Sequence, residues 1–100
     1  MSKDARALLV FFTSNRSGPA RRMESLIAHI ARKERDTLRV KKVDVDERPD
    51  LAERFRVVEV PSIALVKGKR IVARLEGRST APKIASLLDS HLREAETTAA

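Results

Sequence analysis

Residues 8–20 read Leu-Leu-Val-Phe-Phe-Thr-Ser-Asn-Arg-Ser-Gly-Pro-Ala, an apolar run that passes through a polar loop into glycine and proline. The continuous apolar run from Ala7 to Phe12 is typical of a strand covered on both faces. The polar loop supplies side chains that cap helices, and proline is tolerated in a first helical turn, where its missing N–H costs no hydrogen bond. The stretch therefore predicts a central strand that leads directly into a helix.

The rest of the chain alternates between helical and strand patterns. Gly18-Pro19 opens a helix in which apolar residues recur at helical spacing from Ala20 to Ala31, and a second, short amphipathic helix is predicted at 48–56 with Pro49 at its start. Strands are predicted at 37–45, 63–66 and 70–75, and the turn Lys67-Gly68-Lys69 joins the last two as an antiparallel hairpin. A last helix begins at Thr80, and residues 94–100 are predicted to be a disordered tail.

This order, β-α-β-α-β-β-α, predicts an α/β fold. Two crossovers followed by a hairpin give a four-stranded mixed sheet with helices on both faces. A chain of 100 residues has room for one hydrophobic core and no second domain. We therefore expect residues 1–100 to form a single domain with a core at about 5–93.

The composition is basic and lacks sulfur nucleophiles. The chain has 21 Lys and Arg against 14 Asp and Glu, a net charge of +7, and no cysteine. Its pI of about 10.6 permits attraction to polyanions, but three phenylalanines without tyrosine or tryptophan provide few stacking platforms for bases. No apolar run reaches membrane-spanning length. We expect a cytoplasmic protein with no membrane role.

These residues resemble the thioredoxin family over about 5–92. Four segments agree in order: the apolar strand 8–12, Ser17-Gly18-Pro19-Ala20 for the family's Cys-Gly-Pro-Cys, Val43-Asp44-Val45-Asp46 with Pro49, and Val60-Pro61-Ser62. Gly77 is similar to the glycine beside the family's peptide groove. The resemblance implies a thioredoxin-like fold that lacks the N-terminal strand and helix of full-length thioredoxins. It also implies a cis bond before Pro61, with Val60 presenting its backbone to an extended peptide.

Four departures from the family pattern remove its chemistry. Ser17 replaces the nucleophilic cysteine, and Ala20 replaces the resolving one. Arg16 stands where an aromatic residue usually precedes the motif, and Phe11 stands where a buried carboxylate assists proton transfer. Thiol-disulfide exchange needs one thiolate to attack and a second thiol to resolve the mixed disulfide. The chain as given is therefore predicted not to be an enzyme, and it has no catalytic residue.

The leading hypothesis is a redox-inactive binding or adaptor module that holds a protein segment noncovalently at the former active-site groove. Its predicted groove residues are Arg16, Ser17, Gly18, Pro19, Ala20, Val60, Pro61, Ser62 and Gly77. Backbone pairing at Val60 and apolar contact would hold the segment, and nearby arginines favour an acidic protein or peptide partner. No cofactor is expected.

Arg16, Arg21 and Arg22 surround the predicted helix start, where unpaired N–H groups and a partial positive charge suit a phosphate or carboxylate. The competing interpretation is a solvated face on which Ser17 only caps the helix. Anion or nucleic-acid binding at this corner stays an alternative function. His29 and His91 are far apart with no cysteine to join them, so no metal site is expected.

Two more alternatives stay open. If cysteines at positions 17 and 20 were engineered out, the natural protein belongs to the thioredoxin system as a thiol-disulfide oxidoreductase. The replacements at Arg16 and Phe11 argue against this, because such engineering would leave the neighbours unchanged. A homodimer through an exposed sheet edge is an alternative oligomeric state.

Overall fold

The helices and strands form in the predicted order. The computed structural model describes residues 6–99, with side chains through Leu92. Its elements are β1 (Ala7–Thr13), α1 (Gly18–Lys33), β2 (Leu38–Asp44), α2 (Pro49–Arg54), β3 (Ser62–Lys67), β4 (Arg70–Glu76) and α3 (Ala81–Ala99). The predicted strand and helix boundaries agree to within a few residues, except at the end of α3.

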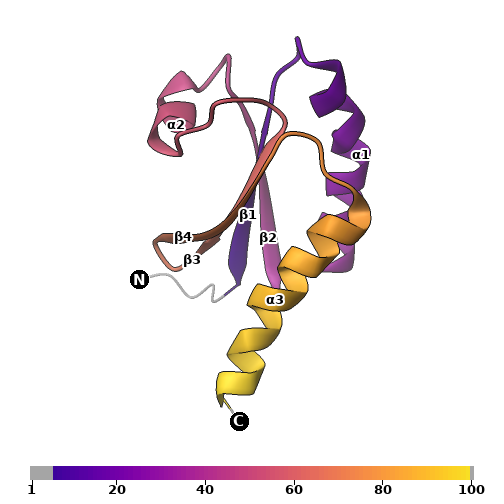
Figure 1. The fold of residues 1–100 in the computed structure, drawn as a ribbon, viewed down its shortest axis with the longest axis vertical. Helices are drawn as coiled ribbons and strands as arrows, with labels where there is room; N and C mark the ends of the chain where they lie inside the picture. Colours follow the sequence, from indigo (N-terminus) through magenta and orange to yellow (C-terminus); the bar gives the residue numbers. More distant parts are fainter. Residues whose placement is uncertain (1–5, 100) are drawn as a thin grey trace.

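The sheet is mixed, as predicted, and has the order β2-β1-β3-β4. β1 pairs parallel with β2 and antiparallel with β3, and β3 pairs antiparallel with β4. Figure 1 shows α1 and α3 on one face of the sheet and α2 on the other. β1 is central and covered on both faces, which explains its unbroken apolar sequence.

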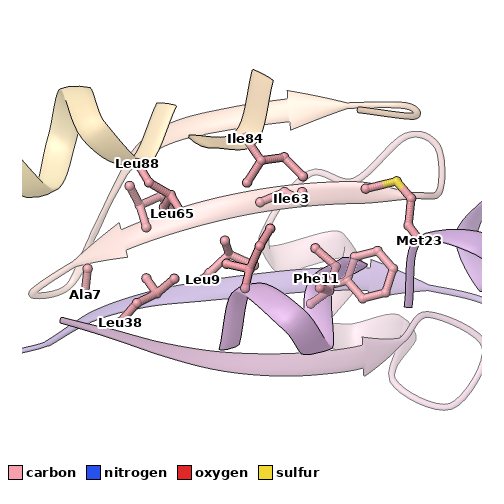
Figure 2. Close-up of a cluster of buried hydrophobic side chains, with 11 residues drawn as sticks. Ala7, Leu9, Phe11, Met23, Leu38, Ile63, Leu65, Ile84 and Leu88 are labelled. Carbon is pink, nitrogen blue, oxygen red and sulfur yellow. The ribbon is translucent and has the colours of Figure 1, made fainter. Parts of the chain in front are cut away.

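Alternate residues of β1 enter two cores, because successive side chains of a strand point to opposite faces. Leu9 and Phe11 join a cluster with α1 and α3, where Met23, Ile84 and Leu88 are buried (Figure 2). Val10 and Phe12 enter the second cluster, on the side of α2. There the rings of Phe12 and Phe55 lie 5.2 Å apart and tilted, a favourable aromatic arrangement that fixes α2 to the sheet.

The end of α3 differs from the prediction. The helix continues to Ala99, past residue 94, where the sequence predicted a tail. Neither glycine nor proline follows Pro82, and alanine and glutamate favour helix, so no sequence signal stops α3 earlier. Ala100 lies outside the described residues. The disorder of residues 94–100 and the single domain over 1–100 stay predictions.

No helix within residues 6–99 is long and apolar enough to cross a membrane.

Candidate functional site

Three segments of the predicted groove meet at one end of the sheet. In the strand register, Phe12 of β1 lies opposite Ser62 of β3, and Ser62 lies opposite Glu76 of β4. The loop after β1, the segment before β3 and the loop after β4 therefore leave the sheet at the same end, which is the upper end in Figure 1. This register brings 14–20, 60–62 and 77 to one end.

Ser14 holds the loop between β1 and α1. Its hydroxyl donates to Asp46 Oδ2 at 2.5 Å and accepts from the Arg16 N–H at 3.1 Å. Its carbonyl accepts from the Ser17 N–H at 3.0 Å. Ser14 is only 5% exposed, so its hydroxyl is committed to positioning the loop and is not offered to a ligand.

The two former sulfur positions are used structurally. Ser17 is the N-cap of α1, and its Oγ accepts from the Ala20 N–H at 3.1 Å. Ala20 is 0% exposed, so its methyl group belongs to the core rather than to the groove surface. The two residues can start a helix and fill a core, but they cannot exchange a disulfide.

Phe11, which the resemblance aligns with the family's buried acid, lies in the main core. Lys42 is exposed and pairs with Glu24 of α1, 3.4 Å from Nζ to Oε1. This pairing is possible because Lys42 lies on the α1 face of β2.

The segment before β3 presents Val60. The Val60–Pro61 bond is cis. Pro61 and Ser62 are buried: the Pro61 carbonyl accepts from the Gly77 N–H at 2.8 Å, and the Ser62 hydroxyl donates to the Glu59 carbonyl at 2.6 Å. Val60 is half-buried, and its backbone N–H and C=O form no hydrogen bond within residues 6–99. Of these residues, Val60 has backbone groups free to pair with another chain.

Gly77, which directly follows β4, supports this segment. Its φ of +78° is a conformation that residues with a Cβ rarely adopt. A Cβ placed at Gly77 would lie 3.5 Å from Glu59 Oε2, so the Glu59 carboxylate lies over this glycine. Sequence reasoning missed Glu59, because nothing in the local pattern indicates that it crosses to β4.

A cleft of about 450 Å³ joins the start of α1 to the loop after β4. Its lining consists of Pro19, Arg22, Met23, Leu26, Arg78, Ser79 and Thr80. It therefore connects the predicted 17–20 segment with the residues that follow Gly77. Arg78, Ser79 and Thr80 were missed in the sequence, although their position directly after Gly77 was a usable signal.

The predicted anion corner is only partly assembled. Arg21 and Arg22 line one hollow of about 430 Å³ with Gly18, Glu24 and Ser25, but Arg16 is not part of its lining. All three arginines are exposed, and none has an ion pair or hydrogen bond from its side chain to any residue whose side chain the structure describes. The first turn of α1 holds no acidic residue to offset them. The region is an uncompensated positive surface.

The acidic turn after β2 is a structural turn. Asp44 Oδ1 accepts from the Asp46 N–H at 2.8 Å. Arg48 donates to both carboxylate oxygens of Asp50, at 3.1 and 2.9 Å, and this hydrogen bonding lowers the pKa of Asp50 to about 2. Among the residues that the structure describes, no group of three His, Asp or Glu side chains can hold a metal ion.

Comparisons with known proteins agree with this geometry. The Thioredoxin family model matches residues 1–90. A thioredoxin-like protein of Synechocystis sp. is 35% identical over 85% of this chain and 78% of its own. A bifunctional thioredoxin reductase/thioredoxin of Mycobacterium leprae is 36% identical over 70% of this chain, which spans only 15% of that protein. The crystal structure of the germline-specific thioredoxin Deadhead of Drosophila melanogaster superposes with a TM-score of 0.82 at 27% identity, covering 88% of this chain and 83% of that one.

Proposed function

This chain belongs to the thioredoxin family, and we propose that it is a redox-inactive member that holds an extended protein segment noncovalently. The observation that carries the proposal is that Ser17 and Ala20, which align with the family's two cysteines, have structural roles in this chain. Ser17 caps α1 through its hydroxyl, and Ala20 is fully buried. The loop after β1, the segment before β3 and the loop after β4 still meet at this end of the sheet. Without cysteine, this site can bind a protein segment only through its shape, its backbone hydrogen-bonding groups and its charge.

The proposed contact begins at Val60. Its N–H and C=O are unpaired within the described part of the chain, so an extended segment can pair with them as an added strand does. Pro61 and Ser62 lie beneath this contact and fix it through the hydrogen bond to Gly77. The segment would therefore touch Val60 and not the buried proline.

The cleft beside Gly77 provides the side-chain contact. Pro19, Met23 and Leu26 give it an apolar wall, and Arg22 and Arg78 give it positive charge. Neither arginine has an ion-pair partner among residues 6–92. An apolar side chain next to a carboxylate suits this lining, so we propose an acidic protein partner.

The test is selection of peptides from a display library on the immobilised chain, followed by fluorescence anisotropy with each selected peptide. We expect Arg78→Glu to weaken binding about tenfold, because it reverses a charge in the cleft. Arg70→Glu is the matched control. It makes the same charge change at the first residue of β4, at the end of the strand that is distant from Arg78. Failure to select any peptide, or equal losses in both variants, would contradict the proposal.

Anion or nucleic-acid binding is the second candidate. It is favoured by the uncompensated charge of Arg16, Arg21 and Arg22 around the start of α1. Fluorescence anisotropy with a labelled oligonucleotide across a salt series tests it, because phosphate contacts release counterions and weaken as salt rises. The absence of binding at low salt would remove this candidate.

A further inference from the structure

Among the described residues, β2 has a neighbouring strand on one side only, and on the other side the backbone groups of Val40 and Lys42 form no hydrogen bond with these residues. In the order β2-β1-β3-β4 it is an edge strand, and β1 is its one neighbour among the described residues. Its seven residues pair with β1 in an unbroken parallel register from Leu38 to Asp44. Proteins often protect such an edge with a proline, a bulge or a very short strand, and β2 contains none of these.

Positively charged side chains are the feature of β2 that opposes unspecific pairing at its edge. Leu38 and Val40 pack toward the main core, and Lys42 reaches Glu24 of α1 on the same face. Since side chains alternate along a strand, Arg39 and Lys41 project from the opposite face, and both are exposed. No side chain described in the structure pairs with Lys41.

The positive charge of β2 distinguishes between two candidate partners for its edge, a second copy of this chain and an acidic strand of another protein. If a second copy paired through β2, Arg39 and Lys41 of both copies would lie on the same face of the joined sheet, and like charges on adjacent strands are destabilising. A net charge of +7 adds to the repulsion between copies. A strand that carries carboxylates gains from the same side chains, so the edge favours an acidic partner over a second copy.

We propose that the outer edge of β2 binds an extended acidic segment of another protein by strand addition. Neighbouring strands share the faces of their side chains, so the pattern of β2 fixes the pattern of the partner. Its residue beside Val40 is apolar and meets the core side of the sheet. Its residues beside Arg39 and Lys41 are aspartate or glutamate. The predicted segment therefore alternates apolar and acidic residues.

This site is separate from the groove. β2 lies at one edge of the sheet, whereas Val60 precedes β3 and Arg78 follows β4 on the other side of β1. A change at Arg78 therefore leaves strand addition at β2 unchanged, and the two proposals fail independently.

The test uses a fluorescein-labelled heptapeptide of alternating valine and glutamate, and the same peptide with lysine in place of glutamate. Anisotropy should show binding of the glutamate peptide alone, weakened by added salt. Arg39→Glu with Lys41→Glu should weaken it about tenfold and create binding of the lysine peptide. The control Lys69→Glu with Arg70→Glu, which changes the net charge equally at the β3–β4 turn, should change binding less than about twofold.

Amide hydrogen exchange locates the contact. Binding should slow exchange within Leu38–Asp44, and circular dichroism should confirm that the variants fold; if the double variant does not fold, Lys41→Gln should still weaken binding about twofold. Equal binding of both peptides, equal losses in the control, or protection outside β2 would overturn the proposal. A dimer whose β2 amides are already protected without peptide would also overturn it, in favour of a second copy.

Discussion

At the scale of single residues, Ser17, which aligns with the first cysteine of the family motif, acts as the cap of α1. Its Oγ accepts from the Ala20 N–H, one of the N–H groups at the start of α1 that lack a helical partner. We expect Ser17→Ala to lower the free energy of unfolding by about 1 kcal/mol, because that N–H loses its acceptor. Urea unfolding followed by circular dichroism measures the loss.

Ser17→Asp is the matched control for this cap. Aspartate keeps an acceptor oxygen at the same position and adds negative charge at the positive end of the helix. Its stability should stay within about 0.5 kcal/mol of the original chain or rise. Equal stabilities of the alanine and original chains would show that the hydroxyl does not cap α1.

The Arg48–Asp50 pair makes a pH prediction at the same scale. Hydrogen bonding to Arg48 lowers the pKa of Asp50 from 3.8 to about 2. A lowered pKa in the folded state favours folding above the unfolded value of 3.8, and the contribution is lost as pH falls through about 2. Because both side chains are more than half exposed, solvent screening keeps this contribution small.

NMR titration of the Asp50 carboxyl carbon checks this assignment. The group should titrate near 2 in the original chain and near 3.8 in Arg48→Gln. A titration near 3.8 with Arg48 intact would mean that the pair does not form in solution.

At the scale of elements, buried side chains on one face hold α1 and α3 against the sheet. Ile84 anchors α3 in the main core at 0% exposure, whereas Ile71 on β4 is 42% exposed. We expect Ile84→Ala to cost about 3 kcal/mol of unfolding free energy, through lost burial and the cavity left behind. Ile71→Ala should cost about 1 kcal/mol or less, because half-exposed groups gain little from burial.

Chemical denaturation of both isoleucine variants tests how α3 is attached. The two changes remove the same atoms, and alanine favours helix over strand, so a larger loss at Ile84 than at Ile71 reports burial against the propensity difference. Similar losses would mean that α3 does not pack on the sheet as Figure 2 shows.

The elements were predictable where the pattern is local and strong. The apolar run of β1 and the stripe of α1, with Pro19 at its start, indicated a buried strand and a helix, and both formed. The extension of α3 to Ala99 was not predicted, because polar, helix-favouring residues after Leu92 carry no stop signal. Boundaries without a cap or a breaker are weakly encoded in the sequence.

At the scale of the whole molecule, the site was predictable only in outline. The family motifs indicated the segments around Ser17, Val60 and Gly77, and the register brings these segments to one end of the sheet. The cleft between Arg22 and Arg78, and the position of Glu59 over Gly77, arise from contacts between residues distant in sequence. No local pattern encodes such contacts, so these residues became visible only in the folded chain.

The whole scaffold makes one prediction about catalysis. The chain has no cysteine and no acid at Phe11, so dithiothreitol-driven reduction of insulin should stay at the blank rate.

Cysteines at the two former positions provide the positive control. Ser17 is the N-cap of α1 and Ala20 lies in its first turn, so cysteines at these positions have the spacing of the family's Cys-Gly-Pro-Cys motif. Ser17→Cys with Ala20→Cys should show turnover. Ser17→Cys alone should not, because no second thiol resolves the mixed disulfide. Turnover by the original chain would contradict the redox-inactive assignment, because the reaction would then need a nucleophile other than sulfur.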